Sequence, residues 1–305
     1  SGKRSARPTS RLFSTPVPTP ECETSSAPTG EEATGRGAGR AAPAAGGGAA
    51  TGEGAGVASS GMRGAGRQQR AVAWDAATGA ILYDKSIISQ IADERFTPEG
   101  WLHAEVLTGS LRSSGRGSTM YVGNVPRQFV LRHYMRGGLV SKFVRDTYVF
   151  SGADKTRSFM EWRLLDKLAS NNMRVPRPAA ARYVQRGTFY TADIITVRVP
   201  GIVPLSRYVS ENDPDDAFWH ACGEALYEFH AAGVYHADMN AYNVQIDGDG
   251  LLWLLDFDKG ALRRPGPWQQ KTLSRLHRSL HKIAGLDPRF NFRAADWEAL
   301  LEGYF

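Results

Sequence analysis

The stretch that decides the fold reads YHADMNAYN at residues 235–243, and the segment LLDFD follows it at 254–258. These segments place Asn243 five positions after Asp238 and Asp256 eighteen positions after it, with an apolar run ahead of the second aspartate. This order and spacing are typical of sites that orient a hydroxyl group and chelate the magnesium of ATP. The chain is therefore expected to transfer phosphoryl groups.

Each polar residue of this constellation has its own expected role. Asp238 would orient the acceptor hydroxyl and receive its proton, while Asn243 and Asp256 would hold Mg²⁺ through hard oxygen atoms. His236 is expected to brace the loop by hydrogen bonding rather than to react. The alternative is that these residues only cap turns around a hairpin, but turn capping does not account for the second aspartate at this distance.

Hydrophobic periodicity divides the chain after residue 70 into strands followed by helices. Strands are expected at 119–122, 128–134, 179–184, 188–197, 244–246 and 251–255. Helices are expected at 155–168, from Asp215 or Asp216 to the glycine at 233, at 268–284 and at 294–303. This order predicts an α+β, protein-kinase-like fold with a small antiparallel-sheet lobe (about 80–200) and a mainly helical large lobe (about 201–305).

The first seventy of the 305 residues differ from the rest in composition. They are rich in Gly, Ala, Ser, Thr and Pro, so we expect a disordered tail at 1–70 ahead of one kinase-like domain at 71–305. The tail has no apolar segment of the kind found in signal peptides, and the chain does not begin with Met. A cloning remnant, a misassigned start and a true flexible tail would all share these features.

The net charge of +6 comes mostly from this tail. Nine Lys and Arg and five Asp and Glu lie in the first seventy residues, which leaves 28 basic and 26 acidic residues in the rest. A nearly neutral domain gives little reason to expect a nucleic-acid partner. No apolar run is long enough to predict a membrane-spanning helix. Cys22 and Cys222 are not expected to pair, which fits a reducing cytoplasm.

Two features of the expected small lobe point to phosphate binding. Gly115 and Gly117 form a glycine-rich turn whose backbone N–H groups can cradle phosphates, although an ordinary loop is the alternative. Arg132 occupies the strand position where protein kinases carry a phosphate-binding lysine, and Glu161 is its expected helix partner. The alternative for this pair is a surface ion pair without a catalytic role.

Two departures from protein kinases argue against a protein acceptor. Asn240 stands two residues after Asp238, where protein Ser/Thr kinases usually carry lysine. About ten residues separate Asp258 from the helix that begins near Trp268, which is too few for a long activation segment. A small or lipid-linked acceptor fits these features better.

Basic residues gather at two places in the sequence. One group surrounds the second expected strand and its connector: Arg132, His133, Arg136, Lys142 and Arg145. The other shares one face of the helix at 268–284: Lys271, Arg275, Arg278 and Lys282. We interpret this face either as solvated or as a contact for an anionic glycolipid or membrane leaflet. His277 and His281 have the spacing of metal ligands, but they are expected to be solvated.

Several short segments share their pattern with a known family. They are GRGS (115–118), VLRHY (130–134), RGG (136–138), KTRSF (155–159), VPRP (175–178), VYHADMNAYN (234–243), WLLDFDKG (253–260), WQQ (268–270) and LEGY (301–304). Together they resemble the 3-deoxy-D-manno-octulosonic acid (Kdo) kinase family, lipopolysaccharide-core kinases of the protein-kinase-like superfamily. The resemblance runs from about residue 80 to the end, and the first seventy residues have no counterpart in it.

The resemblance implies an ATP- and Mg²⁺-dependent phosphotransferase with an alcohol group as acceptor. Its acceptor would be the 4-hydroxyl of Kdo on a lipid A precursor, phosphorylated during lipopolysaccharide inner-core biosynthesis. The enzyme would lie peripherally on the cytoplasmic face of the inner membrane, against its anionic surface. Asp238 carries over as the catalytic residue and Asn243 and Asp256 as metal ligands, whereas Arg132 and Glu161 carry over by position alone.

Three alternatives to this function stay open. One is a lipopolysaccharide core heptose kinase or another small-molecule sugar or aminoglycoside kinase. Another is a pseudokinase scaffold without activity, against which the retained Asp238, Asn243 and Asp256 argue. The last, nucleic-acid binding through the basic tail, is the least favoured. The sequence does not indicate an oligomeric state.

Overall fold

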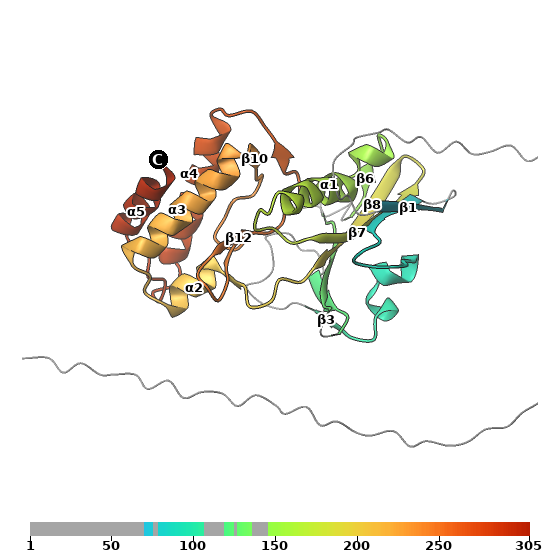
Figure 1. Cartoon of the computed structure of the whole chain (residues 1–305), viewed down its shortest axis with the longest axis horizontal. Coiled ribbons are helices and arrows are strands. Elements are labelled where there is room, and N and C mark those ends of the chain that lie inside the picture. Colours follow the sequence, from blue (N-terminus) through green and yellow to red (C-terminus); the bar gives the residue numbers. More distant parts are fainter. Residues whose placement is uncertain (1–69, 76–78, 107–118, 125–126, 136–145) are drawn as a thin grey trace, which may run out of the picture. The chain divides into compact units, whose positions relative to one another are not determined.

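The protein has an α+β fold built from antiparallel sheets and helices (Figure 1). The computed structural model describes residues 70–75, 79–106, 119–124, 127–135 and 146–305. Within these ranges most strands come before residue 200, and every long helix except the one at 157–170 comes after it, so the predicted α+β class is confirmed. The expected tail at 1–70 lies outside the described residues except for Arg70, which begins the first strand.

The main sheet has the spatial strand order β1-β2-β7-β8-β5-β4-β3, with β6 paired to β8. Every strand pairing described for it is antiparallel. The strands are β1 (Arg70–Asp75), β2 (Gly79–Asp84), β3 (Ala104–Val106), β4 (Thr119–Val122), β5 (Phe129–His133), β6 (Tyr148–Val149), β7 (Pro178–Arg186) and β8 (Phe189–Val197). Strands β4, β5, β7 and β8 match the predicted strands within two residues, whereas β1, β2, β3 and β6 were not predicted.

The main sheet is covered on both faces. Ala80 and Leu82 of β2 belong to the core cluster that includes helix α1 (Arg157–Ser170). Ile81 and Tyr83, which alternate with them, belong to a second cluster on the opposite face, together with Phe96 of the short helix η1 (Asp93–Phe96). A sheet buried on both sides provides firm support for the side chains that β5 presents.

Helix α1 begins and ends two residues later than its apolar spacing predicts. Lys155 belongs to a separate turn, η4 (Ala153–Lys155), and Thr156 is the extended N-cap residue of α1. The predicted apolar stripe is fully buried in the core cluster: Phe159, Trp162, Leu165 and Leu168. The same helix also buries Glu161, which its apolar pattern does not explain.

The remaining helices are α2 (Leu205–Glu211), α3 (Asp216–Ala231), α4 (Trp268–Ala284) and α5 (Ala294–Tyr304). Asp215 caps α3 as predicted, since its carboxylate accepts from the Phe218 N–H at 3.0 Å. Buried residues of α3, α4 and α5 share one core cluster, and Figure 1 shows these helices as neighbours. No helix in the described part of the chain is both long enough and apolar enough to cross a membrane.

Glycines allow α3 and α5 to approach closely. A Cβ atom added at Gly303 would lie 2.0 Å from the carbonyl oxygen of His220, and one at Gly223 would lie 2.0 Å from that of Leu300. Because no side chain fits at these distances, both glycines are required by the helix contact.

Two small sheets hold the loops that contain the polar motif found in the sequence. One pairs β10 (Val234–Tyr235) with β13 (Ala261–Leu262), and the other has the order β12-β11-β9. The predicted hairpin is confirmed by β11 (Val244–Ile246) and β12 (Leu252–Leu254), and β9 (Val203–Pro204) adds to its edge. The loop 236–243 is therefore fixed at both ends by strands.

Candidate active site

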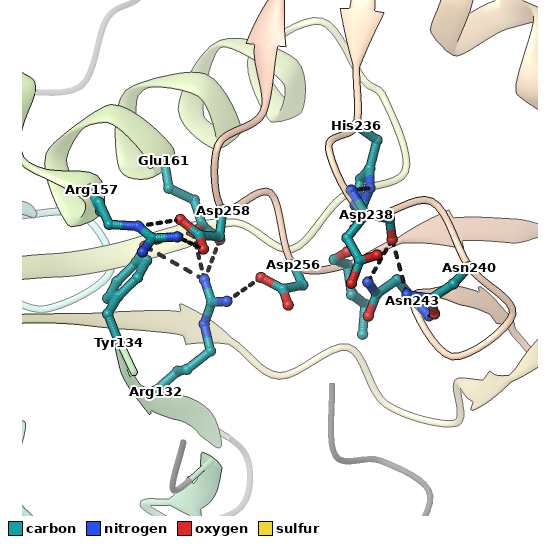
Figure 2. Close-up of polar contacts among 11 residues, drawn as sticks. Arg132, Tyr134, Arg157, Glu161, His236, Asp238, Asn240, Asn243, Asp256 and Asp258 are labelled. Atoms are coloured by element: carbon teal, nitrogen blue, oxygen red, sulfur yellow. Dashed lines mark hydrogen bonds and ion pairs between the residues drawn. The ribbon is translucent and has the colours of Figure 1, made fainter. Parts of the chain in front are cut away.

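The loop after β10 holds Asp238 through two asparagine side chains (Figure 2). The Nδ2 groups of Asn240 and Asn243 both donate to the Asp238 carbonyl oxygen, at 3.1 and 2.9 Å. Asn240 Oδ1 in turn accepts from the backbone N–H groups of Tyr242 and Asn243, at 2.9 and 3.1 Å. These bonds fix the backbone around Asp238, whose side chain stays 39% exposed.

His236 links this loop to the segment that follows β12. Its Nδ1 accepts from the backbone N–H of Asp238 at 3.2 Å, and its Nε2 lies 2.8 Å from the Leu255 carbonyl oxygen. An acceptor at Nδ1 and a donor at Nε2 describe a neutral imidazole. Burial lowers the pKa of His236, in keeping with this state. The predicted bracing contacts are therefore present.

Asp256 leaves β12 in a left-handed backbone conformation, with φ of 63°. Such a conformation is rare for a residue other than glycine and persists only where its surroundings impose it. Here the Leu255 N–H donates to the Asn243 carbonyl oxygen at 2.9 Å, so the strand end is tied to the Asp238 loop. Burial acts to raise the pKa of Asp256, but the nearby positive charges, Arg132 first among them, and the hydrogen bonds to its carboxylate together lower it.

Arg132 and Glu161 lie in contact, as the sequence predicts. Arg132 Nη2 donates to both Glu161 oxygens at 2.5 Å, and its Nη1 pairs with Asp256. The Tyr134 hydroxyl also donates to Glu161, at 2.5 Å. Burial raises the pKa of Glu161 to about 7, although the charge of Arg132 opposes the shift. This network is shown in Figure 2.

The structure adds an ion pair that the sequence does not reveal. Arg157 at the start of α1 pairs with Asp258, with Nε donating to Oδ1 at 2.7 Å. Arg157 lies one helical turn before Glu161, so both side chains emerge on the same face of α1. That shared face, together with the place of Arg157 in the KTRSF segment at 155–159, is a local signal that could have indicated this residue.

Arg275 on α4 contacts the Asp238 loop, which the sequence analysis does not predict. Its Nη1 donates to the Ala237 carbonyl oxygen at 2.7 Å and to Asp238 Oδ1 at 3.1 Å. The interpretation of the basic face of α4 as a solvated or membrane-contacting surface therefore does not account for this residue. His277 and His281, on the same helix, contact each other through Nε2 atoms 2.9 Å apart, and His277 stacks on Trp297.

A cavity adjoins the network and takes its lining from both the main sheet and the loops. Its lining residues are Thr119, Tyr121, Val130, Arg132, Glu161, Leu165, Pro176, Ile194, Thr196, Ile202, Tyr242, Asn243, Gln245, Leu255 and Asp256. A largely apolar lining with a few charged groups suits a nucleotide. Gly115 and Gly117, the predicted phosphate-binding turn, lie outside the described residues.

The donor set at this cavity fits Mg²⁺. Asn243 and Asp256 both line it and offer amide and carboxylate oxygens. Asn243 uses its Nδ2 atom within the loop, which leaves its side-chain oxygen as an acceptor. Magnesium sites commonly take one or two such ligands and complete the shell with phosphate oxygens and water.

Comparison with known proteins shows the family to which the chain is similar. The model of the lipopolysaccharide kinase (Kdo/WaaP) family matches residues 105–304. A 3-deoxy-D-manno-octulosonic acid kinase of Stenotrophomonas maltophilia is 40% identical over 208 residues, which cover 68% of this chain and 82% of that protein. The enzyme of the same name from Photobacterium profundum is 36% identical over 224 residues, or 73% and 94% of the two chains.

The α+β fold and the spacing of Asp238, Asn243 and Asp256 are typical of a phosphotransferase of the kinase type. The chain belongs to the lipopolysaccharide kinase (Kdo/WaaP) family. It is accordingly an ATP-dependent phosphotransferase.

Proposed function

We propose that this enzyme is a Kdo kinase, which transfers the γ-phosphoryl group of ATP to the 4-hydroxyl of Kdo on a lipid A precursor. The observation that carries the proposal is the braced loop that presents Asp238 beside a cavity lined by Asn243 and Asp256, in a chain 36–40% identical to Kdo kinases. The reaction belongs to the assembly of the lipopolysaccharide inner core.

The proposed chemistry assigns the proton to Asp238. Its carboxylate orients the acceptor hydroxyl and receives the proton as the hydroxyl oxygen bonds to the γ-phosphorus. The bond from the γ-phosphorus to the bridging oxygen breaks at the same time, and ADP leaves. Asn243 and Asp256 would hold Mg²⁺, which supplies charge neutralisation along the phosphates.

Arg132 and Glu161 are proposed to serve ATP binding. The guanidinium of Arg132 lines the cavity and takes the place of the lysine that other kinases use. Glu161 and Asp256 hold that guanidinium from two sides, which orients it toward the cavity. Gly115 and Gly117, outside the described residues, are proposed to bind the phosphates through their backbone N–H groups.

The fold supports a two-lobed arrangement of the kinase kind. The proposed small lobe (about 80–200) contains the main sheet and α1, and the proposed large lobe (about 201–305) contains α2 to α5. The proposed domain spans 71–305, and residues 1–69 of the expected tail lie outside the described residues. Residues from both proposed lobes line the nucleotide cavity.

The acceptor is proposed to be a glycolipid rather than a protein. Only the two-residue strand β13 lies between Asp258 and α4, so this region carries no long segment on which a peptide could dock. A core heptose kinase is the nearest alternative, because it would need the same site and differ only in the sugar. A pseudokinase scaffold is disfavoured by the retained Asp238, Asn243 and Asp256.

The enzyme is proposed to act peripherally at the cytoplasmic face of the inner membrane. Lys271, Arg278 and Lys282 are exposed on α4 and carry positive charge that suits anionic lipid headgroups. No nucleic-acid partner is proposed.

Incubation of the purified enzyme with ATP, Mg²⁺ and two acceptor glycolipids tests the proposed function. One acceptor ends in Kdo and the other carries heptose as its terminal sugar. Phosphate on the 4-hydroxyl of Kdo, located by NMR of the product, is the expected result. Turnover on the heptose acceptor alone would favour the heptose kinase instead.

A further inference from the structure

Arg275 reaches the catalytic loop from a distant element. It lies on α4, and its Nη1 donates to the Ala237 carbonyl oxygen at 2.7 Å and to Asp238 Oδ1 at 3.1 Å. The side chain keeps 47% of its surface exposed. Both contacts use a single nitrogen, and within the part of the chain that the structure describes Nη2 and Nε form no hydrogen bond, which leaves this edge with donors for a ligand.

The loop itself offers no cation at this place. Residues 235–243 contain no Lys or Arg, and Asn240 stands where protein kinases usually have lysine. The Asn240 side chain is held within the loop, with its Nδ2 donating to the Asp238 carbonyl oxygen and its Oδ1 accepting from two backbone N–H groups. His236 is buried, and burial lowers its pKa, so it stays neutral. Among the described residues, Arg275 places a positive charge beside Asp238.

The position of Arg275 relative to the cavity indicates which substrate meets it. Arg132, Asn243 and Asp256 line the cavity, whereas neither Asp238 nor Arg275 is among its described lining residues. Asp238 and Arg275 thus lie outside the lining of the cavity assigned to the nucleotide. In the proposed mechanism the acceptor hydroxyl meets Asp238, so Arg275 is beside the acceptor.

We propose that Arg275 binds the carboxylate of a sugar-acid acceptor and thereby selects it over neutral sugars. The inference rests on the proposed function, since it names the group by which that site recognises Kdo. A guanidinium edge matches a carboxylate with two parallel hydrogen bonds, and its strength comes from the charge on both partners. Kdo carries this carboxylate close to the hydroxyl that is phosphorylated, whereas a heptose carries none.

Because Arg275 also contacts Asp238, binding of the sugar carboxylate would help to align the acceptor hydroxyl for phosphoryl transfer. One nitrogen of the guanidinium donates to Asp238 Oδ1, so it orients the carboxylate that accepts the proton of the sugar hydroxyl. With the sugar carboxylate on the other edge, the same side chain sets the distance between the sugar and its proton acceptor.

The test compares two forms of the acceptor glycolipid, one with the free carboxylate and one with the carboxyl converted to a neutral primary amide. The wild-type enzyme is expected to prefer the carboxylate by about 10- to 100-fold in kcat/KM, the range for a charge-assisted hydrogen-bond pair. Arg275→Gln should lose this preference and keep the KM for ATP. The matched control is Arg163→Gln, an arginine on α1 with 44% exposure that pairs with Asp154.

The outcomes separate this inference from the proposed function. An Arg275→Gln enzyme that slows on both acceptors alike and keeps the wild-type preference would show that Arg275 only braces the loop, and the inference would be wrong. A wild-type enzyme that phosphorylates both forms equally would also overturn it while leaving the proposed function intact. No turnover of either form by the wild type would overturn both. If Arg275→Gln has no measurable turnover, the preference for the carboxylate over the amide is measured as the ratio of the equilibrium dissociation constants of the two glycolipids.

Discussion

Arg132 on β5 forms an ion pair with Asp256, which lies 124 positions later in the chain. The same guanidinium holds both oxygens of Glu161, and all three groups are largely buried. One side chain thus joins the sheet, helix α1 and the expected metal ligand. This arrangement supports the proposal that Arg132 takes the place of the usual kinase lysine.

Replacement of Arg132 by lysine should impair ATP use although the charge is kept. A compact ammonium group cannot span both carboxylates, so we expect kcat/KM for ATP to fall about 10- to 100-fold. Arg163→Lys, at an exposed ion pair on α1, is the control and should change little.

In a double-mutant cycle of Arg132→Met and Glu161→Gln, the effects on kcat/KM for ATP should be strongly non-additive. Additive losses would mean that the two residues do not act together.

The activity should depend on pH through Glu161, whose pKa burial raises to about 7. Above this pH the carboxylate is charged and holds Arg132, whereas below it the carboxyl is protonated and the ion pair is lost. We therefore expect kcat/KM for ATP, which reports the free enzyme, to fall as the pH drops through about 7. Glu161→Gln should be less active, and its kcat/KM for ATP should not show this fall on the acidic side of the pH profile. If kcat/KM for ATP in that variant still fell at low pH as in the wild type, another group would be responsible for the pH dependence.

Gly303 should be indispensable to stability rather than to catalysis. Its Cβ would lie 2.0 Å from the His220 carbonyl oxygen, so Gly303→Ala must push α5 away from α3. We expect a loss of about 1–3 kcal/mol in the free energy of unfolding, measured by urea denaturation. Gly285→Ala is the control, because its nearest contact would be an ordinary 3.5 Å. Equal stabilities for the two variants would contradict the packing argument.

The basic face of α4 should bind membranes independently of Arg275. Reversal of Lys271, Arg278 and Lys282 to Glu is expected to weaken binding to anionic vesicles in a sedimentation assay, with each charge contributing about 1 kcal/mol. Turnover of a water-soluble acceptor should be retained. Equivalent reversals of Lys155, Arg163 and Lys167, which are also exposed, are the control. Equal vesicle binding by the two variants would show that the basic face of α4 does not contact the membrane.

Local chemistry made much of this site predictable from sequence. One short loop contains Asp238, Asn240 and Asn243. Because these residues are at most five positions apart, their spacing in the sequence already limits which hydrogen bonds they can form. The long helices and β11–β12 were predicted because their apolar patterns are regular. Strand β2 was missed because Ala80 to Tyr83 are buried on both faces, which gives a continuous apolar run without alternation.

The contacts of Arg157 and Arg275 could not be predicted in the same way. Arg157 meets Asp258 across 101 positions, and Arg275 meets Asp238 across 37. Amphipathic spacing identifies the buried face of α4, but it does not say which loop lies beside the other face. The strands β9, β10 and β13 have two residues each, so they show no periodicity and exist only through their pairing.

Transfer of labelled phosphate from ATP to the Kdo glycolipid by wild type and Asp238→Asn tests the central claim most directly. The amide cannot take the acceptor proton, so we expect kcat to fall about 10²- to 10⁴-fold while ATP still binds. Asp249→Asn, on the exposed hairpin turn, is the control and should match wild type. Undiminished phosphorylation by Asp238→Asn would contradict the assignment of Asp238 as the residue that receives the proton.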